Sequence, residues 1–360
     1  MCSPGIFNTG PSRMLFRAAI VVCLLRAPVF GVEPTRRDQE HFLSRAAFAE
    51  NRLWVLSDAG ALSTIEPGAK VRVPADLPEP ALDLCAVDDV VHVLTCAGNG
   101  CANWTLRRRT DRRWTTVATL AAKADSIAAL SCAPAGTTTV LTNRRLIQVV
   151  DGKAAERTLS EKIETGTVTS IHVTPDEVFV GINAGEWGGG LRVIARKTGK
   201  VSVIEKTTGG LCKGPLNTAC DPVNAIADAP WKPECVIAAI GLVHFAPHGR
   251  LVEICGRDVR RIYFRRLGHG RSKEPGHDDD SFETEAFFGM IPVGKQLVAV
   301  GVDGIYRFDG PGAPVRTPLP KFKVVGNIGV SFALPGIALV LTGINQRRSI
   351  SGNVPMLVPR

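Results

Sequence analysis

"GGGLRVIARKTGK" (residues 188–200) and "DGIYRFDGPG" (residues 303–312) follow one pattern, although more than a hundred residues separate them. In each stretch, glycines precede a short strand-like run, and a charged turn with another glycine follows it. Glycine readily adopts the positive φ angles that tight turns between strands require. A chain that contains the same hairpin twice is predicted to contain a structural repeat.

The repeat extends over almost the whole chain. Copies begin near residues 40, 80, 125, 167, 223, 283 and 327, and insertions at 209–222 and 267–282 lengthen two of the intervals. Each copy has room for four antiparallel strands in about 40–50 residues, which is the length of a propeller blade. The sequence therefore predicts an all-β chain that forms a seven-bladed β-propeller of four-stranded antiparallel blades. The last copy shows three clear strands, and we expect the residues just after the leader to supply its fourth.

The N-terminus resembles a secretory leader. Arg13 and Arg17 precede the apolar run 18–25, and Val29 and Gly31 suit a cleavage site after residue 31. A membrane anchor is the alternative, but this run is too short to cross about 30 Å of hydrocarbon. We therefore predict a signal peptide over 1–31 and a single β-propeller domain over 32–360, exported to the periplasm or the extracellular space. No later segment is apolar enough to span a membrane.

The cysteine pattern also suits an exported chain. Of ten cysteines, Cys2 and Cys23 fall in the leader, which leaves eight in the mature chain. Three pairs flank turns, and the repeat places the remaining two at the same position of neighbouring blades. The predicted disulfides are Cys85–Cys132, Cys96–Cys101, Cys212–Cys220 and Cys235–Cys255. Two free buried thiols at Cys85 and Cys132 are the alternative, and zinc is disfavoured because no second pair of closely spaced cysteines follows.

The repeats resemble those of a known propeller type. "VFVGINAGEWGGGLRVIARKTGK" and "VAVGVDGIYRFDG" each run as an apolar strand, a Gly/Asp turn and a Leu/Ile-x-Arg/Tyr strand. This pattern resembles the β-propellers of two-component-regulator type, which occur in exported sensor and ligand-binding modules. The resemblance implies the architecture and no catalytic residue.

The net charge of the chain and the absence of several known motifs disfavour some classes of function. The leader carries three arginines and no acid, so its removal lowers the net charge from +9 to +6, which is too mild to indicate a polyanion partner. We expect no nucleic-acid binding, no transmembrane segment in the mature chain, and a monomer. The G-x-S-x-G nucleophile motif, the P-loop and the dinucleotide-binding fingerprint are absent.

The unusual loops should emerge on one face of the propeller, at 95–104, 183–190, 209–224, 244–249, 267–284 and 344–353. The most suggestive is "NAGEWGGG", in which Asn183, Glu186 and Trp187 lie among glycines that would let a ligand approach. The alternative is a surface turn with Trp187 packed on the next blade. We expect a ligand site over the central channel, with Trp187 and Glu186 at its wall and His244 or His248 near.

Metal binding is a weaker expectation. His244 and His248 flank a turn and would need further ligands, for which Asp221, Asn224, Glu285 and Asp303 are candidates. The predicted function is a binding or scaffolding module for a peptide, glycan or protein partner, without a cofactor. The competing hypothesis is a propeller hydrolase or lyase with a cation such as Ca²⁺ at the central channel. Four acid, amide or imidazole groups converging over the axis would favour the enzyme, and an apolar or glycine-lined mouth would favour the binder.

Overall fold

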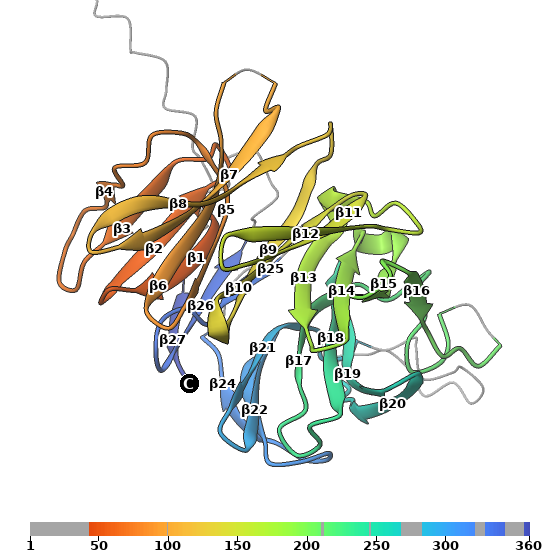
Figure 1. Cartoon of the computed structure of the whole chain (residues 1–360). Coiled ribbons are helices and arrows are strands. Elements are labelled where there is room, and N and C mark those ends of the chain that lie inside the picture. Colours follow the sequence, from red (N-terminus) through yellow and green to blue (C-terminus); the bar gives the residue numbers. More distant parts are fainter. Residues whose placement is uncertain are drawn as a thin grey trace, which may run out of the picture. The chain divides into compact units, whose positions relative to one another are not determined.

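The computed structural model describes residues 43–98, 100–209, 212–244, 246–267, 283–320, 328–342 and 356–360. Their strands form seven antiparallel sheets within one compact unit, His41–Arg360 (Figure 1). The blades are, in chain order: β1 (Leu43–Ala49), β2 (Arg52–Ser57), β3 (Leu62–Ile65) and β4 (Val73–Pro74); β5 (Ala81–Val87), β6 (Val90–Cys96), β7 (Asn103–Thr110) and β8 (Arg113–Ala121); β9 (Ile127–Ala133), β10 (Thr137–Thr142), β11 (Arg145–Val150) and β12 (Lys153–Thr158); β13 (Val168–Val173), β14 (Glu177–Asn183), β15 (Gly189–Ala195) and β16 (Val201–Ile204); β17 (Val223–Asp228), β18 (Cys235–Val243), β19 (Pro247–Cys255) and β20 (Asp258–Tyr263); β21 (Phe287–Val293), β22 (Gln296–Gly301), β23 (Gly304–Phe308) and β24 (Val315–Pro318); β25 (Ile328–Ser331), β26 (Ile337–Thr342) and β27 (Met356–Pro359).

The predicted seven-bladed β-propeller is confirmed, and with it the architecture that the resemblance implied. Within each blade the strands lie in chain order, and the first strands of successive blades lie next to one another. The described part of the last blade has three strands, β25 to β27. The fourth strand that we expected, like the leader and the boundary at residue 31, lies outside the described residues. No helix in the described part of the chain is long and apolar enough to cross a membrane.

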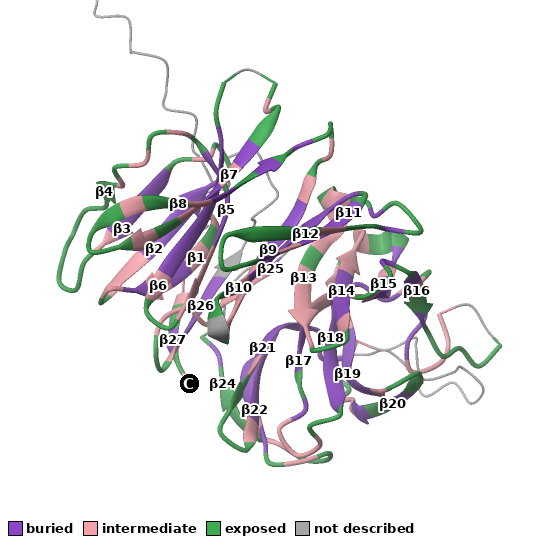
Figure 2. Ribbon diagram, viewed as in Figure 1, coloured by how far each residue is buried: buried purple, intermediate pink, exposed green. Residues whose placement is uncertain are grey.

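The hydrophobic core is divided among the contacts between blades. Six buried clusters lie between successive blades, from the first to the seventh. β18 shows why its sequence is continuously apolar: Val236, Ala238 and Ile240 pack against the fourth blade, whereas Ile237 and Ala239 pack against the sixth. Because successive residues of a strand point to opposite faces, both faces of such a strand are buried. Figure 2 shows the contrast with β12, an outer strand that is mostly exposed.

Polar side chains connect the inner strands of neighbouring blades. The Thr169 hydroxyl donates to the carbonyl oxygens of Gly181 in its own blade (3.1 Å) and Val223 in the next (2.6 Å). Asn224 repeats this arrangement one blade later: its amide donates to Gly241 at 2.7 Å and Phe287 at 2.8 Å. In both places the inner strand has an irregular register, which turns one polar side chain toward the next blade.

All four predicted disulfides are present. Cys85–Cys132 joins the inner strands of the second and third blades, so the alternative of free thiols is wrong. Cys235–Cys255 connects β18 with β19, while Cys96–Cys101 and Cys212–Cys220 each close a loop. Disulfides persist in oxidising compartments, so these four fit a secreted or extracellular domain.

Arginines of the second blade take part in ion pairs. Arg107 donates two hydrogen bonds to Glu79, at 2.9 and 2.6 Å. Arg109 binds Glu50 of the first blade at 3.1 Å and lies over the Trp54 ring. Arg107 and Arg109 therefore support the packing of the first two blades.

Candidate functional site

Two neighbouring loops hold four of the nine predicted site residues, namely Asn183, Glu186, Trp187 and Asp221. The first, which we call the Trp187 hairpin, comprises residues 183–190 between β14 and β15. The second, which we call the disulfide loop, comprises residues 212–222 before β17 and is closed by Cys212–Cys220. Backbone hydrogen bonds join them, because the amides of Gly189 and Gly190 donate to the carbonyl oxygens of Thr218 (2.9 Å) and Asp221 (2.8 Å).

Two glycines of the hairpin, Gly188 and Gly190, allow this close contact, and Gly189 allows the hairpin itself to close. Gly188, Gly189 and Gly190 all have positive φ angles. A Cβ atom would lie 2.4 Å from Ala219 at position 188, 2.1 Å from the Ile182 carbonyl oxygen at position 189, and 2.5 Å from Thr218 at position 190. The disulfide loop therefore occupies the space beside Gly188 and Gly190 that the sequence predicts to be open to a ligand.

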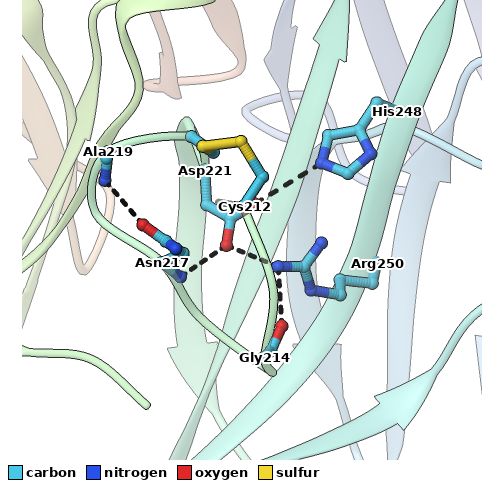
Figure 3. Close-up of a disulfide and its surroundings, with 8 residues drawn as sticks. Cys212, Gly214, Asn217, Ala219, Asp221, His248 and Arg250 are labelled. Atoms are coloured by element: carbon cyan, nitrogen blue, oxygen red, sulfur yellow. Dashed lines mark hydrogen bonds and ion pairs between the residues drawn. A yellow bond between two sulfur atoms is a disulfide. The ribbon is translucent and has the colours of Figure 1, made fainter. Parts of the chain in front are cut away.

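A buried ion pair attaches the disulfide loop to β19 (Figure 3). The Asp221 and Arg250 side chains are 0% and 2% exposed, and Nη2 of Arg250 lies 2.5 Å from a carboxylate oxygen of Asp221. The same oxygen accepts the backbone N–H of Asn217 at 2.6 Å, and Arg250 also donates to the Gly214 and Pro215 carbonyl oxygens. Because a buried charge needs both a counter-ion and hydrogen bonds, this network holds the loop in one conformation. Asp221 is therefore a structural anchor, and His248 lies at its edge, with Nε2 3.5 Å from the other oxygen.

Trp187 is the most exposed tryptophan of the chain. Its side chain is 80% exposed, so it does not pack on the next blade as the alternative interpretation held. It ends a short 3-10 turn, Gly185–Trp187, in which its backbone N–H donates to Ala184. An exposed indole on a supported turn provides a large, rigid contact surface.

Glu186 and His244 form a pair beside this tryptophan. Nδ1 of His244 lies 2.9 Å from Oε2 of Glu186, and the two residues come from the fourth and fifth blades. His244 and His248, which we considered as partners in a metal site, instead contact different carboxylates. The structure thus brings Glu186, Trp187 and His244 to one region and places His248 against the loop anchor.

A separate cavity lies against Trp187. It has a volume of about 270 Å³ and is lined by residues of the connection 161–167, the Trp187 hairpin, β15 and the disulfide loop. We call it the Trp187 pocket and define it by Glu161, Lys162, Glu164, Trp187, Arg192 and Thr218. Sequence reasoning did not identify the other five residues, because their proximity depends on how three connections meet.

The central cavity is a different site. It measures about 690 Å³ and is lined mainly by the first strands of the blades, including small and apolar residues of β1, β5, β9 and β25. Asn183 and Asn224 lie on its wall, and Trp187 and Glu186 do not. The amide of Asn183 donates to Oδ1 of Asn224 at 2.6 Å. The two parts of the expected site, the channel and the exposed tryptophan, are therefore separate in the structure.

The remaining candidate metal ligands are bound to arginines. The Arg265 guanidinium donates to Glu285 at 2.7 Å, to Tyr306 at 2.8 Å and to Asp303. Arg316 also donates to Asp303, at 3.0 Å. Burial and the charge of Asp303 raise the pKa of Glu285 to about 7. Partial burial alone would raise the pKa of Asp303, but hydrogen bonds from Tyr306, Arg316 and Arg265 lower it to about 2.

The four proposed metal ligands do not converge. Asp221 binds Arg250, Asn224 binds Asn183, and Glu285 and Asp303 share Arg265. Among the residues that the structure describes, the one compact group of three residues with metal-ligand side chains is Cys235, Glu253 and Cys255. The two cysteine sulfur atoms form a disulfide, and both carboxylate oxygens of Glu253 accept hydrogen bonds from Nη2 of Arg260, so this group is not a metal site.

Comparisons with known proteins show the fold and no family. No protein-family model and no curated protein matches the chain. Among solved structures, a GH74 xyloglucanase from Xanthomonas campestris is 13% identical with a TM-score of 0.50, over 85% of this chain and 51% of that one. The extracellular domain of a one component system from B. thetaiotaomicron is 12% identical, with a TM-score of 0.45, over 84% and 37%. YCF48 bound to D1 peptide is 14% identical, with a TM-score of 0.44, over 72% and 75%.

Proposed function

We propose that this chain is an exported β-propeller that acts as a binding or scaffolding module and recognises a peptide, glycan or protein partner through the face that bears the Trp187 hairpin. The observation that carries the proposal is Trp187 itself. A side chain this large and apolar is 80% exposed on a hairpin that a disulfide-closed loop and a buried ion pair support. Exposed, rigid aromatic residues are typical of the centres of interaction surfaces.

The enzyme hypothesis receives less support from the geometry. A hydrolase or lyase with a cation at the channel would need several carboxylates with oxygens directed at one point. Asp221 and Glu285 are buried in pairs with Arg250 and Arg265, and Asp303 accepts from two arginines. The channel wall is instead rich in small and apolar residues, together with amides that bind each other. The comparisons do not choose between the two hypotheses, because they include both a xyloglucanase and a peptide-bound protein.

The location of the protein belongs to the same proposal. A leader over 1–31 would export the chain to the periplasm or the extracellular space. The four disulfides support this location because they require an oxidising compartment. We further propose that the mature chain is a monomer, without a nucleic-acid partner and without a bound cofactor.

Selection of ligands with a matched pair of variants tests the proposal. Immobilised mature protein would be screened against a random peptide display library and a glycan array. We expect selected ligands to bind the Glu186→Ala/Trp187→Ala variant about tenfold more weakly, or worse, because both changes remove contacts from the centre of the surface. Val315→Ala, which truncates an exposed apolar side chain on β24, should bind as the wild type does.

Two results would overturn the proposal. One is that the wild type selects no ligand from either library. The other is that the double variant keeps its full affinity while its melting temperature matches that of the wild type.

A further inference from the structure

The lining of the Trp187 pocket indicates the chemical class of its ligand. This inference rests on the binding function proposed above and concerns the cavity of about 270 Å³ beside Trp187. A cavity of this size suits a single ring-sized group, and small-molecule sites combine an apolar surface with a few well-placed polar groups.

Trp187 is the one aromatic side chain in the lining of this pocket. Its exposed indole offers a flat apolar face, and the turn that carries it is supported by the disulfide loop. A lone flat face of this kind suits a ligand ring that has one apolar side. It does not suit a quaternary ammonium group, which is bound in a cage of several aromatic rings, or a polyproline segment, which docks in an aromatic-lined groove.

The polar groups of the pocket balance in charge. Its lining includes two acidic residues, Glu161 and Glu164, and two basic residues, Lys162 and Arg192. The pocket thus offers acceptors and donors without a net charge, which favours a neutral ligand with many hydroxyl groups over an anion or a cation. Carboxylate and guanidinium groups can each make two parallel hydrogen bonds, and two adjacent ring hydroxyls present a matching pair.

We infer that the Trp187 pocket binds a neutral sugar residue of a glycan. One face of a pyranose ring stacks on the Trp187 indole, and its hydroxyls bond to Arg192 and to the carboxylates of Glu161 and Glu164. The disulfide loop contributes the Thr218 side of the pocket, so ligand contacts come from the fourth blade and from the two connections that flank it.

Calorimetric titration with soluble hexasaccharides tests this inference. The probes are linear hexasaccharides of β-linked glucose, α-linked glucose, N-acetylglucosamine and xylose. We expect at least one of them to bind the wild type. Trp187→Ala should weaken that binding about tenfold or more, whereas Trp187→Phe should retain most of it, because a phenyl ring still stacks.

Arg192→Lys separates hydrogen bonding from charge. It keeps the cation but loses the planar fork, so we expect it to weaken sugar binding several-fold. Val315→Ala is the control, and melting temperatures establish that all variants are folded.

The outcomes separate this inference from the proposed function. If no hexasaccharide binds while a displayed peptide binds in a Trp187-dependent way, the sugar inference is wrong and the binding function stands. If sugars bind equally well to Trp187→Ala, the pocket is wrongly assigned. If neither sugars nor peptides bind the wild type, both proposals fail.

Discussion

A buried carboxylate in this propeller connects neighbouring blades through hydrogen bonds. Asp83 is the clearest case, because one oxygen accepts from Arg45 of the first blade (3.1 Å) and from its neighbour Leu84 (2.8 Å), and the other accepts from the Leu130 amide of the third blade (2.8 Å). Burial raises the pKa of this carboxyl. A single side chain thus connects the inner strands of three blades.

We expect Asp83→Ala to lower the free energy of unfolding by about 3 kcal/mol, because it leaves two buried amides without an acceptor. Urea denaturation measures this change. Asp76→Ala, which removes an exposed carboxylate, is the control and should change stability by less than about 0.5 kcal/mol. Equal stability of the two variants would show that the hydrogen bonds of Asp83 do not stabilise the contact between the blades.

Because of Glu285, the free energy of unfolding depends on pH between about pH 4.5 and about pH 7. Its pKa of about 7 in the folded chain is higher than the ordinary value of 4.5, because of burial and the charge of Asp303. The protonated form therefore favours folding: its contribution is complete below about pH 4.5 and is lost as the pH rises through about 7. The opposite holds for Asp303, whose contribution is present above pH 3.8 and is lost as the pH falls through about 2.

We expect the wild type to lose about 1–3 kcal/mol of unfolding free energy between about pH 5 and about pH 8, relative to Glu285→Gln. Gln cannot ionise, so this variant lacks the dependence. Urea denaturation at several pH values gives both curves. Parallel curves would contradict the assignment of this transition to Glu285.

At the scale of the element, the Trp187 hairpin depends on how closely the disulfide loop approaches it. Gly188 has a φ of 81°, and a Cβ atom there would lie 2.4 Å from the carbonyl carbon of Ala219 in the disulfide loop. Gly185, in the same turn, also has a positive φ (66°), but a Cβ atom there would meet nothing within 4 Å. Both positions have a positive φ, but they differ in the space that is available to a Cβ atom.

We expect Gly188→Ala to destabilise the protein by about 2–4 kcal/mol, from backbone strain and displacement of the disulfide loop. Gly185→Ala should cost only about 1 kcal/mol, because strain alone acts there. Thermal unfolding of both variants measures the difference. A larger loss for Gly185→Ala would contradict the described packing of the two loops.

At the scale of the whole molecule, one covalent bond joins two blades. Cys85–Cys132 links inner strands across a sequence separation of 47, whereas Cys96–Cys101 spans only 5. A disulfide that closes a longer loop restricts the unfolded chain more strongly. The first bond should therefore contribute more to the stability of the propeller.

We expect Cys85→Ser/Cys132→Ser to lower the free energy of unfolding by about 3–4 kcal/mol. Cys96→Ser/Cys101→Ser should lower it by about 2 kcal/mol. Guanidinium denaturation under non-reducing conditions compares them. Equal losses would mean that loop length does not control their contributions.

The sequence by itself determined the blades, because a blade is a local unit. Gly-rich turns and apolar runs, such as those in 188–200 and 303–312, recur at equivalent positions along the chain. Each copy of the repeat contains the strands of one blade, and these strands pair with their neighbours in the chain. The same register placed Cys85 and Cys132 at equivalent positions, which is why even a bond between blades could be predicted.

Only the tertiary structure decided what the polar residues of the loops do. Asp221 is a candidate metal ligand in the sequence, but it lies in the disulfide loop and binds Arg250, which is 29 positions away on β19. Glu186 and His244 meet across two blades, and the Trp187 pocket forms where three connections converge. The repeat pattern specifies backbone pairing within a blade. Contacts between loops depend on insertions that the repeat does not describe, so their partners become known only when the blades are packed side by side.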